Sequence, residues 1–481
     1  MTDHLAQPAP AGDAGSEDIF GHLHPSAGEG RADGPGNFDA HHPPDKELLD
    51  DCVHCGFCLP TCPTYALWGE EMDSPRGRIY LMDLVREGSA SFDDQLVRHF
   101  DTCLGCMACV TACPSGVQYD KLLESMRPQI ERHHERGWAD RTFRELVFAL
   151  FPHPRRLRLA AIGGLAYQRS GLPGLLRRGR LLDRLPARLR ALESLLPPIR
   201  ARDLVADPPE RVAAVGTPRR KVAVLTGCVQ RVFFSGVNAA TVRTLAAEGC
   251  EVLIPPDQGC CGALSMHTGR EPEALTRARD TIATFERYDV DTIVVNVAGC
   301  GSTMKEYGTL LRDEPDWAER AAAFSAKVRD VTEVLAELEP RAPRNPIEGR
   351  VAYHDACHLG HAQGVRTAPR AMLATIPGLE VVDLPEAELC CGSAGVYNLL
   401  EPDAAADLGR RKVANVRSVQ PDLVATANPG CLLQIRRHLG DEAPPLLHPV
   451  ELVDASIRGV SPLPLLPPVP PAPVAAPQDV A

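Results

Sequence analysis

The sequence lacks any apolar run long enough to cross a bilayer. A membrane-spanning helix needs about eighteen or more apolar residues in succession, and the best candidate, 157–167, is short and flanked by arginines. The start of the chain shows no basic segment, apolar core and cleavage site of a secretory signal. The formal net charge of −12 argues against a nucleic-acid partner. No Gly-x-Gly-x-x-Gly fingerprint opens a predicted helix, so no flavin or nicotinamide site of the Rossmann type is expected.

Cysteine, by contrast, is abundant and patterned. Seventeen cysteines in a chain without a secretory signal indicate a reducing compartment, and the cytoplasm is the expected location. Eight of them form two runs of identical spacing, Cys-x-x-Cys-x-x-Cys-x-x-x-Cys-Pro, inside 62 positions. The first run is Cys52, Cys55, Cys58 and Cys62, and the second is Cys103, Cys106, Cys109 and Cys113.

This spacing is typical of the ligands of two [4Fe–4S] clusters. Three cysteines at two-residue gaps can wrap one face of a cubane, and in two-cluster ferredoxins of this spacing the fourth cysteine of each run ligates the other cluster. The predicted ligands are Cys52, Cys55, Cys58 and Cys113 for the first cluster, and Cys62, Cys103, Cys106 and Cys109 for the second. Zinc usually takes two cysteine pairs separated by a longer loop, and a disulfide framework suits a short secreted chain, so both alternatives fit less well.

The length and the two ends of the chain predict several domains between unstructured termini. The 481 residues, 44% of them hydrophobic, are enough for roughly three domains. Residues 1–44 are rich in Gly, Pro, Ala, Asp and His and predict a disordered leader. Eight prolines between 462 and 477 predict an extended or disordered tail over 458–481. Four histidines of the leader are expected to be exposed and without a ligand: His22, His24, His41 and His42.

Residues 45–140 are predicted to form a mostly helical module around the two clusters. Apolar residues at helical intervals predict helices over 76–86 and 119–136. The following segment, 141–220, is interrupted by prolines and predicts a basic connector of short helices. From Arg144 to Arg220 there are 16 Lys and Arg against 6 Asp and Glu. Two interpretations stay open: solvated arginine faces, or a basic docking face for a partner subunit or an anionic membrane.

The remaining sequence predicts two copies of an α/β domain. Short β-branched runs alternate with amphipathic helices from residue 221 onward, which indicates parallel βαβ layers. The predicted strands are 221–225, 291–296, 351–353 and 423–426. The cysteines of the first copy are Cys228, Cys260, Cys261 and Cys300, and those of the second are Cys357, Cys390, Cys391 and Cys431. Their intervals, 32 and 39 residues against 33 and 40, predict a duplication with domains over 221–345 and 346–457.

These eight later cysteines are candidates for a further redox or metal centre. Cysteines at the carboxyl ends of parallel strands converge where α/β sheets usually bind ligands, and four thiols suffice for another iron–sulfur centre, in one copy or in both. The alternative role is that of small buried hydrophobes, which is the role expected for the unmatched Cys250. Around Cys357, His354, Asp355 and His358 are candidates for a proton donor or a metal ligand, although ordinary sequence drift explains them equally well. No catalytic residue is assigned.

The residues around the cysteines resemble those of a known family. The segments are Cys52-Val-His-Cys-Gly-Phe-Cys58, Thr61-Cys-Pro-Thr-Tyr65, Ser74-Pro-Arg-Gly-Arg-Ile-Tyr-Leu81 and Cys113-Pro-Ser-Gly-Val117, followed by the two Cys-Cys-Gly repeats. From residue 45 to about 455 the chain resembles the iron–sulfur subunit of bacterial glycolate oxidase. The resemblance implies a multidomain fold, in which an α-helical two-[4Fe–4S] ferredoxin domain is followed by two duplicated α/β cysteine-rich (CCG) domains.

The resemblance also implies a function. Such a subunit carries electrons from flavoprotein subunits, which hold FAD and oxidise glycolate to glyoxylate, towards a quinone-type acceptor, and peripheral association with the inner face of the cell membrane is compatible with this. The same cysteine pattern occurs in iron–sulfur subunits of lactate utilisation, of anaerobic glycerol-3-phosphate dehydrogenase and of heterodisulfide reductase, the last with chemistry at the CCG centre. Heterodisulfide reductase-like repeats usually close with Cys-x-x-Cys. Here Cys300 and Cys431 stand alone, which disfavours a noncubane cluster of that kind.

Overall fold

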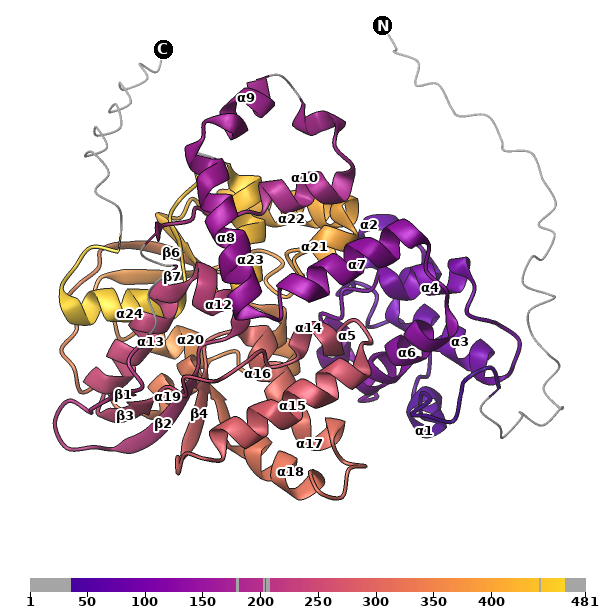
Figure 1. Cartoon of the computed structure of the whole chain (residues 1–481), viewed down its shortest axis with the longest axis horizontal. Coiled ribbons are helices and arrows are strands. Elements are labelled where there is room, and N and C mark those ends of the chain that lie inside the picture. Colours follow the sequence, from indigo (N-terminus) through magenta and orange to yellow (C-terminus); the bar gives the residue numbers. More distant parts are fainter. Residues whose placement is uncertain (1–35, 179–180, 202–203, 205–207, 441–442, 463–481) are drawn as a thin grey trace, which may run out of the picture.

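The protein consists of a helical module, a helical arm and a body with two sheets (Figure 1). The computed structural model describes residues 36–178, 181–201, 204, 208–440 and 443–462. Most of the predicted leader, 1–35, and most of the predicted tail, 463–481, lie outside the described residues, as do His22 and His24.

The N-terminal module is helical, as the spacing of its apolar residues predicted. The predicted helices over 76–86 and 119–136 are confirmed as α3 and α6. Ser74 begins α3 by accepting a hydrogen bond from the Gly77 amide at 3.0 Å, and Pro75 occupies the first turn, where its missing N–H costs nothing. The elements of the module are α1 (Lys46–Asp50), α2 (Pro63–Trp68), the 3-10 helix η1 (Glu71–Asp73), α3 (Pro75–Arg86), α4 (Asp94–Asp101), α5 (Ala108–Ala112) and α6 (Tyr119–His133).

The last part of the predicted leader is ordered, so the expectation of disorder through residue 44 is wrong for 36–44. Phe38 is 5% exposed and belongs to the core of the helical module. Asp39 accepts hydrogen bonds from the Arg132 guanidinium, the nearer at 2.7 Å. His41 and His42, expected to be without a partner, both contact the Glu271 carboxylate, at 3.0 and 3.3 Å. A single apolar anchor and a charged partner on α6 are enough to order this segment, and composition does not show either.

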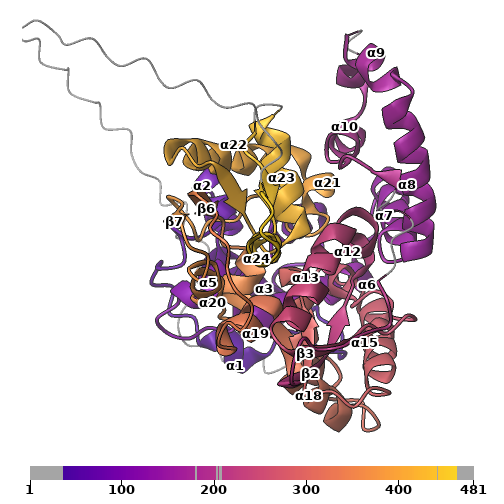
Figure 2. The same cartoon turned by 90° about the vertical axis from the view of Figure 1, so that its left-hand side faces the viewer.

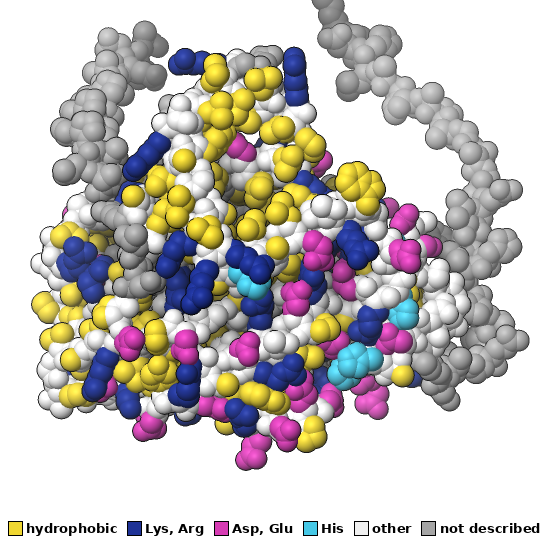
Figure 3. All heavy atoms as spheres, viewed as in Figure 1, with side chains coloured by type: hydrophobic (Ala, Val, Ile, Leu, Met, Phe, Trp, Pro, Cys, Tyr) yellow, Lys and Arg dark blue, Asp and Glu magenta, His cyan; other side chains and the backbone are white. Residues whose placement is uncertain are grey.

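The connector forms an arm that projects from the body (Figures 1 and 2). Its elements are α7 (Trp138–Leu150), α8 (Pro154–Arg169), α9 (Leu172–Arg178), the 3-10 helix η2 (Leu182–Arg184) and α10 (Ala187–Ser194). The expectation of short helices is wrong for α8, which runs for 16 residues because Pro154 stands in its first turn and Pro173 beyond its end. Hydrophobic side chains gather over the arm (Figure 3). Within the described ranges, no helix has the length and apolar character needed to cross a membrane.

The body contains the predicted duplication as two parallel sheets. The first sheet has the order β1-β3-β2-β4-β5 and the second the order β7-β6-β8-β9, so β2 and β6 occupy matching positions. All described pairings are parallel except that of β1 with β3. The strands are β1 (Arg211–Val212), β2 (Arg220–Leu225), β3 (Cys250–Leu253), β4 (Thr292–Val295), β5 (Val328–Asp330), β6 (Gly349–Tyr353), β7 (Leu379–Asp383), β8 (Leu423–Ala425) and β9 (Leu446–Leu447). Since β1 joins the first sheet, this repeat begins earlier than the predicted 221.

Helices cover both sheets. Those of the first repeat are α12 (Cys228–Phe233), α13 (Ser235–Ala247), α14 (Ala263–Met266), α15 (Glu271–Phe285), α16 (Ala298–Lys305), α17 (Tyr307–Leu310), α18 (Ala318–Lys327) and α19 (Val331–Glu337). Those of the second are the π-helical turn η3 (His358–Ala362), α20 (Ala368–Leu373), α21 (Tyr397–Leu400), α22 (Pro402–Ser418), α23 (Pro429–Leu439) and α24 (Pro449–Arg458).

The two repeats share one hydrophobic core. Val224 of β2, Val351 of β6 and Leu423 of β8 are all fully buried in the same cluster. Helix α24 of the second repeat packs on α13 of the first, where the Arg243 guanidinium contacts the Asp454 carboxylate at 2.7 Å. Cys250 of β3 is fully buried in this core, as expected for an unmatched cysteine. The two repeats are therefore packed against each other through one core. The carboxyl ends of β2 and β6 lie on the same side of the body as the arm.

Gly77 provides a test of the close packing of α3 against η1. A Cβ atom at this position would lie 2.0 Å from the Glu71 carbonyl oxygen of η1, so alanine must displace backbone. We expect Gly77→Ala to lower the free energy of unfolding by about 1–3 kcal/mol, measured by denaturation. Gly163→Ala in α8 is the matched control, because nothing lies within 4 Å of its added Cβ. The control is expected to be neutral or stabilising by up to about 1 kcal/mol, and equal effects of the two substitutions would contradict this account of α3.

Candidate metal centres

The two cysteine loops of the helical module have the same backbone shape. The residue two positions after the first cysteine and the residue after the second cysteine have positive φ in both loops: His54 (53°) and Gly56 (88°), Gly105 (59°) and Met107 (62°). Positive φ is unfavourable for a side chain such as that of His54 or Met107, and it persists where the surroundings demand it. Both loops therefore curl in the same way, as expected if they enclose the same kind of group.

The four predicted ligands of the second cluster lie together. Cys62, Cys103, Cys106 and Cys109 are all buried and all line one small cavity of about 20 Å³. The Cys62 thiol comes from the first run, at the start of α2, as the exchange of fourth ligands requires. No carboxylate lines this cavity, and its one charged side chain is that of Arg78.

The predicted ligands of the first cluster also come together, but nearer the surface. Burial raises the pKa of Cys52, and the nearby thiols of Cys113 and Cys55 raise it further. Burial raises the pKa of Cys58 to about 11, with smaller contributions from Cys52 and Cys62. Cys55 is exposed, and the other three are half-buried. Cys58 packs against the same hydrophobic cluster that contains Cys103 and Cys109, so the two sets lie next to one another.

Arg78 is a buried cation beside the second set. Its guanidinium donates to the Asp73 carbonyl at 2.6 Å, to the His99 carbonyl at 2.6 Å and to the Thr64 hydroxyl at 3.2 Å. Although burial opposes ionisation of the Cys103 thiol, the charges of Arg78 and Arg127 outweigh it and lower the pKa of this cysteine. An anionic thiolate-bound cluster needs such a positive charge in a dry interior.

Arginines also hold the carbonyls of the two loops. Arg76 donates to the His54 carbonyl at 2.8 Å, and Arg127 donates to the Cys103 carbonyl at 2.6 Å. Sequence reasoning used Arg76 and Arg78 as a family signature and missed these roles. The signal was present for Arg78, because it lies four residues before the buried Met82 and seven before Val85, on the apolar face of α3.

The eight CCG cysteines also gather in two groups of four, as their matched spacing predicted. In the first repeat the Cys228 and Cys260 sulfurs are 3.6 Å apart, and in the second the Cys357 and Cys390 sulfurs are 3.9 Å apart. A thiol hydrogen bond from Cys228, and a second from Cys261, lower the pKa of Cys260 well below its usual range. The corresponding bonds from Cys357 and Cys391 do the same for Cys390. In each repeat the first cysteine of the pair is the preferred thiolate, and a thiolate is what a metal binds.

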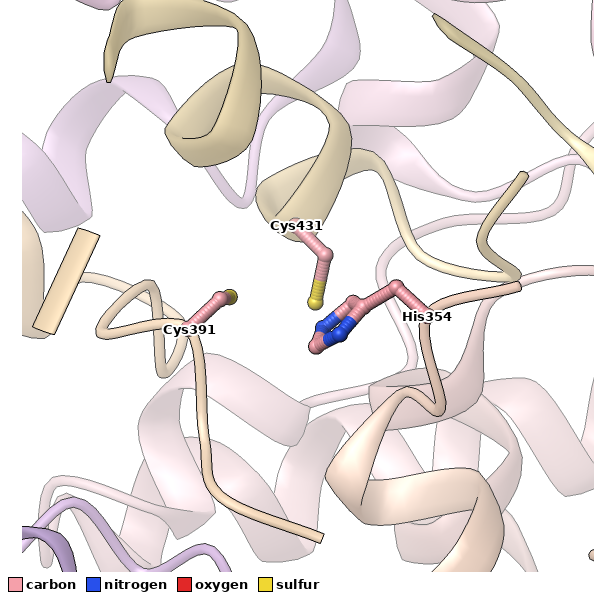
Figure 4. A group of neighbouring side chains, drawn as sticks. All are labelled: His354, Cys391 and Cys431. Carbon is pink, nitrogen blue, oxygen red and sulfur yellow. The ribbon is translucent and has the colours of Figure 1, made fainter. Parts of the chain in front are cut away.

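Among the residues that the structure describes, the second repeat brings a histidine to its cysteines (Figure 4). His354, Cys391 and Cys431 are buried, and one ligand atom of each lies within 4.8 Å of the others. A thiol hydrogen bond from Cys391 lowers the pKa of Cys431 to about 5 against the effect of burial, and a bond from His354 lowers it further. Thr226, which follows β2 as His354 follows β6, is engaged elsewhere, because its hydroxyl accepts a hydrogen bond from the Arg231 guanidinium at 2.9 Å. Imidazole and thiolate together suit a transition-metal centre.

The other two candidates around Cys357 have structural roles. Asp355 forms two hydrogen bonds with the Arg370 guanidinium, at 2.8 and 2.7 Å, and is not a ligand of the cysteine group. His358 joins three parts of the molecule, because its Nε2 lies 3.0 Å from the Gly105 carbonyl and its Nδ1 2.8 Å from the Ser302 hydroxyl. Since a carbonyl only accepts, Nε2 carries the proton and Nδ1 accepts from Ser302. Burial lowers the pKa of His358, which keeps this ring neutral.

The second cluster loop packs directly on the second repeat. Cys106 shares one buried apolar cluster with Cys390, and Leu104 and Leu408 belong to the same cluster. His361 adds a polar contact, because its Nδ1 accepts from the Thr111 hydroxyl at 2.7 Å. The first cluster loop has no such cover: Val53 and Phe57 are each 67% exposed.

A cavity of about 620 Å³ lies between the repeats and beneath the arm. Apolar side chains of α8 and α10, including Leu157, Ala161 and Leu189, form one side. Thiols of both repeats form another, and these are Cys228, Cys260, Cys261, Cys300, Cys357, Cys390 and Cys431. The arrangement offers a largely apolar chamber in contact with both CCG cysteine groups.

Comparisons with known proteins agree with this arrangement. Residues 48–117 match the 4Fe-4S dicluster domain family, 139–196 match the linker region of the glycolate oxidase iron-sulfur subunit, and 222–305 and 351–436 match the cysteine-rich domain family. A solved hypothetical protein from Helicobacter pylori has a similar fold, with a TM-score of 0.52 at 10% identity, covering 85% of this chain and 72% of its own.

Several curated proteins are similar over most of the chain. The probable glycolate oxidase iron-sulfur subunit of Bacillus subtilis is 41% identical over 82% of this chain and 89% of its own. The glycolate oxidase iron-sulfur subunit of Escherichia coli is 35% identical over 85% of this chain and 95% of its own. Lactate utilization protein A of an Exiguobacterium strain is 30% identical over 49% of this chain and 98% of its own.

The fold, the thiol sets and the domain matches define an iron–sulfur electron-transfer protein with a two-cluster domain and two CCG domains. The chain belongs to the family of glycolate oxidase iron-sulfur subunits. It is accordingly a non-flavin subunit of an oxidoreductase complex, and iron–sulfur clusters are its cofactors.

Iron content tests the second ligand set. Cys106→Ser removes one sulfur from the four that line the small cavity, and we expect loss of one cluster and of about half of the ferredoxin-domain iron. Iron analysis and electron paramagnetic resonance of the purified chain measure this. Cys250→Ser is the matched control, a buried cysteine in the core of the body, and is expected to keep all the iron. An unchanged iron content in Cys106→Ser would exclude Cys106 as a ligand.

Proposed function

We propose that this chain carries electrons from a flavoprotein partner, which holds FAD and oxidises glycolate to glyoxylate, to the second CCG repeat and on to a quinone-type acceptor. The burial of Cys106 and Cys390 in one apolar cluster is the observation that carries the proposal, because it brings a predicted cluster ligand close to a CCG thiol. When bound, [4Fe–4S] clusters supply one-electron carriers, which is what a two-electron flavin donor and a chain of redox centres require.

The exposed first loop is the proposed entry point. Val53 and Phe57 flank the exposed Cys55 and present apolar surface to a partner, whereas the matching Leu104 and Ala108 of the second loop are buried. A partner that docks on the first loop also excludes water from the Cys55 side of the first set. The predicted exchange of Cys62 and Cys113 between the runs then connects the first ligand set, at the surface, with the second ligand set, in the interior.

Arg78 is proposed to stabilise charge in the second ligand set, and His358 to position that set against the second repeat. The buried guanidinium of Arg78 stabilises negative charge near Cys103 and Cys62, which favours the reduced state of a cluster held there. His358 directly follows Cys357, and its neutral ring donates a hydrogen bond to the Gly105 carbonyl. This bond keeps the two thiol groups at a fixed separation. His354 is the proposed additional ligand in the second CCG group, beside Cys391 and Cys431.

The 620 Å³ cavity is the proposed place where electrons leave the chain. Its volume is within the range of sites for small organic ligands. A quinone ring is planar and apolar with two carbonyl oxygens, and the cavity offers apolar walls with the half-buried His267 and the two CCG thiol groups at its lining.

The donor assignment is tested on the native complex. With the flavoprotein partner present, glycolate is expected to reduce the clusters within the turnover time, seen as bleaching of visible absorbance and a new paramagnetic signal. Lactate and glycerol 3-phosphate are the comparison donors. Reduction by one of these alone would overturn the glycolate assignment. Turnover by the chain without any flavoprotein would instead favour chemistry at the CCG centre itself.

The entry point is tested by Phe57→Ser combined with Val53→Ser. Loss of this apolar contact is expected to slow reduction by the flavoprotein at least ten-fold, since two buried apolar side chains contribute roughly 1.5–3 kcal/mol each. Iron content and reduction by dithionite should be unchanged. Val215→Ser, at a position 60% exposed on the body, is the control. If both variants are reduced at the rate of the unmodified chain, the partner docks elsewhere.

A further inference from the structure

The arm carries a concentration of exposed hydrophobic side chains. Nine of the fourteen large hydrophobic residues that are exposed among the described residues fall between 138 and 189. They are Trp138, Leu146, Leu159, Ile162, Leu172, Leu175, Leu181, Leu185 and Leu189. Scattered exposed apolar residues are ordinary, but a concentration on one projecting element marks an interaction surface.

Helix α8 is apolar on two opposite faces. Leu157 and Ala161 face the body and are 4% and 1% exposed. Leu159 and Ile162 lie on the other side and are 70% and 52% exposed. The body covers only the first of these faces. The exposed Arg155 lies one turn before Leu159 on the outer side, so this side combines apolar and basic side chains.

The charge of the arm from α8 to α10 is mostly positive. Residues 154–194 contain ten arginines, no lysine and two acidic residues, Asp183 and Glu193, in a chain whose formal net charge is −12. The exposed arginines are Arg155, Arg156, Arg169, Arg178, Arg184 and Arg190. In Figure 3 basic side chains stand at both sides of the arm's tip, with hydrophobic side chains between them. Leucine and arginine together, with few acidic residues, are the composition of a segment that lies at an anionic lipid surface.

The shape of the arm favours a lipid surface over a protein partner. Both views show α9 and the adjoining ends of α8 and α10 standing away from the body (Figures 1 and 2). Leu172 and Leu175 lie in this outermost helix and are 43% and 66% exposed. Such a convex tip can enter the boundary between headgroups and acyl chains, while its arginines remain with the phosphates.

We propose that the arm from α8 to α10, over residues 154–178 and 181–194, docks this chain on a membrane surface rich in anionic phospholipid, with the leucines of α8 and α9 inserted between the headgroups. The inner face of the same arm lines the 620 Å³ cavity through Leu157, Ala161 and Leu189. Docking would thus set the cavity close to the membrane, where a lipid-soluble acceptor is concentrated. This last consequence rests on the proposed function, whereas the docking itself does not.

Vesicle co-sedimentation of the full-length, cluster-loaded chain tests the proposal. We expect binding to phosphatidylcholine vesicles that contain about one-third phosphatidylglycerol, little binding to phosphatidylcholine alone, and loss of binding as salt rises from about 0.1 to 1 M. Arg169→Glu and Arg178→Glu should each weaken binding roughly five-fold or more. Leu159→Asp combined with Leu175→Asp should weaken it at least ten-fold.

Matched controls keep the test specific. Arg287→Glu and Val215→Asp change a similarly exposed cation and a similarly exposed apolar residue on the body, and both should bind vesicles as the unmodified chain does. Iron content reports whether each variant is folded and loaded.

Equal binding of the unmodified chain to both kinds of vesicle, no binding to either, or arm variants that bind normally would overturn the proposal. So would arm variants that lose the flavoprotein on co-purification but keep vesicle binding, because the arm would then be a subunit interface. Vesicle binding is measured on the chain alone, so a wrong donor assignment leaves its outcome unchanged.

Discussion

The burial of many cysteine sulfurs, some of which carry charge, is the constraint on which this structure depends. An unpaired buried anion is costly, and eleven of the seventeen cysteines are buried. Two features of the structure compensate for the cost of buried negative charge. Around the second cysteine loop the compensation is a cation. The buried Arg78 donates to two carbonyls, two hydroxyls and the Asp73 carboxylate, and its charge also acts on Cys103 and Cys62. In the CCG repeats the thiols compensate one another, by hydrogen bonds in which one sulfur of each pair becomes the preferred thiolate.

The duplication becomes functionally uneven because of where the helical module packs. Both repeats have the same strand order and the same four thiols, but Cys390 of the second repeat shares a buried cluster with Cys106. His358 and His361 hold that contact, and His354 adds an imidazole to Cys391 and Cys431. The first repeat has Thr226 at the end of its strand and contributes mainly the shared core, the other wall of the cavity and the support of α24. The proposed electron path, which favours one of two similar sites, therefore rests on packing and not on the cysteine motif.

Local patterns predicted a large part of this architecture. The helices α3 and α6, the strands β2, β4, β6 and β8, and the grouping of four thiols per repeat all follow from residue period or matched spacing, which act over short stretches of chain. Two of the misses share a cause, which is a partner distant in the sequence. The ordered segment 36–44 depends on Phe38 and Asp39 finding partners on helices of the module. The length of α8 is a separate case, because it depends on where Pro154 and Pro173 fall relative to its ends. The roles of Arg76 and Arg78 depend on carbonyls far along the chain.

The sequence by itself determined the chemistry: the number and spacing of the sulfurs, the repeat, and the absence of a nucleotide fingerprint. These are properties of residue type and interval, and they survive any arrangement of the domains. The tertiary structure alone decided which loop is exposed, which repeat meets the second cysteine set, that a basic apolar arm stands over a cavity, and that His354 joins the thiols. The reason is that each of these is a contact between segments tens or hundreds of residues apart, whose partners are selected by the packing of one shared core rather than by any local preference of the chain.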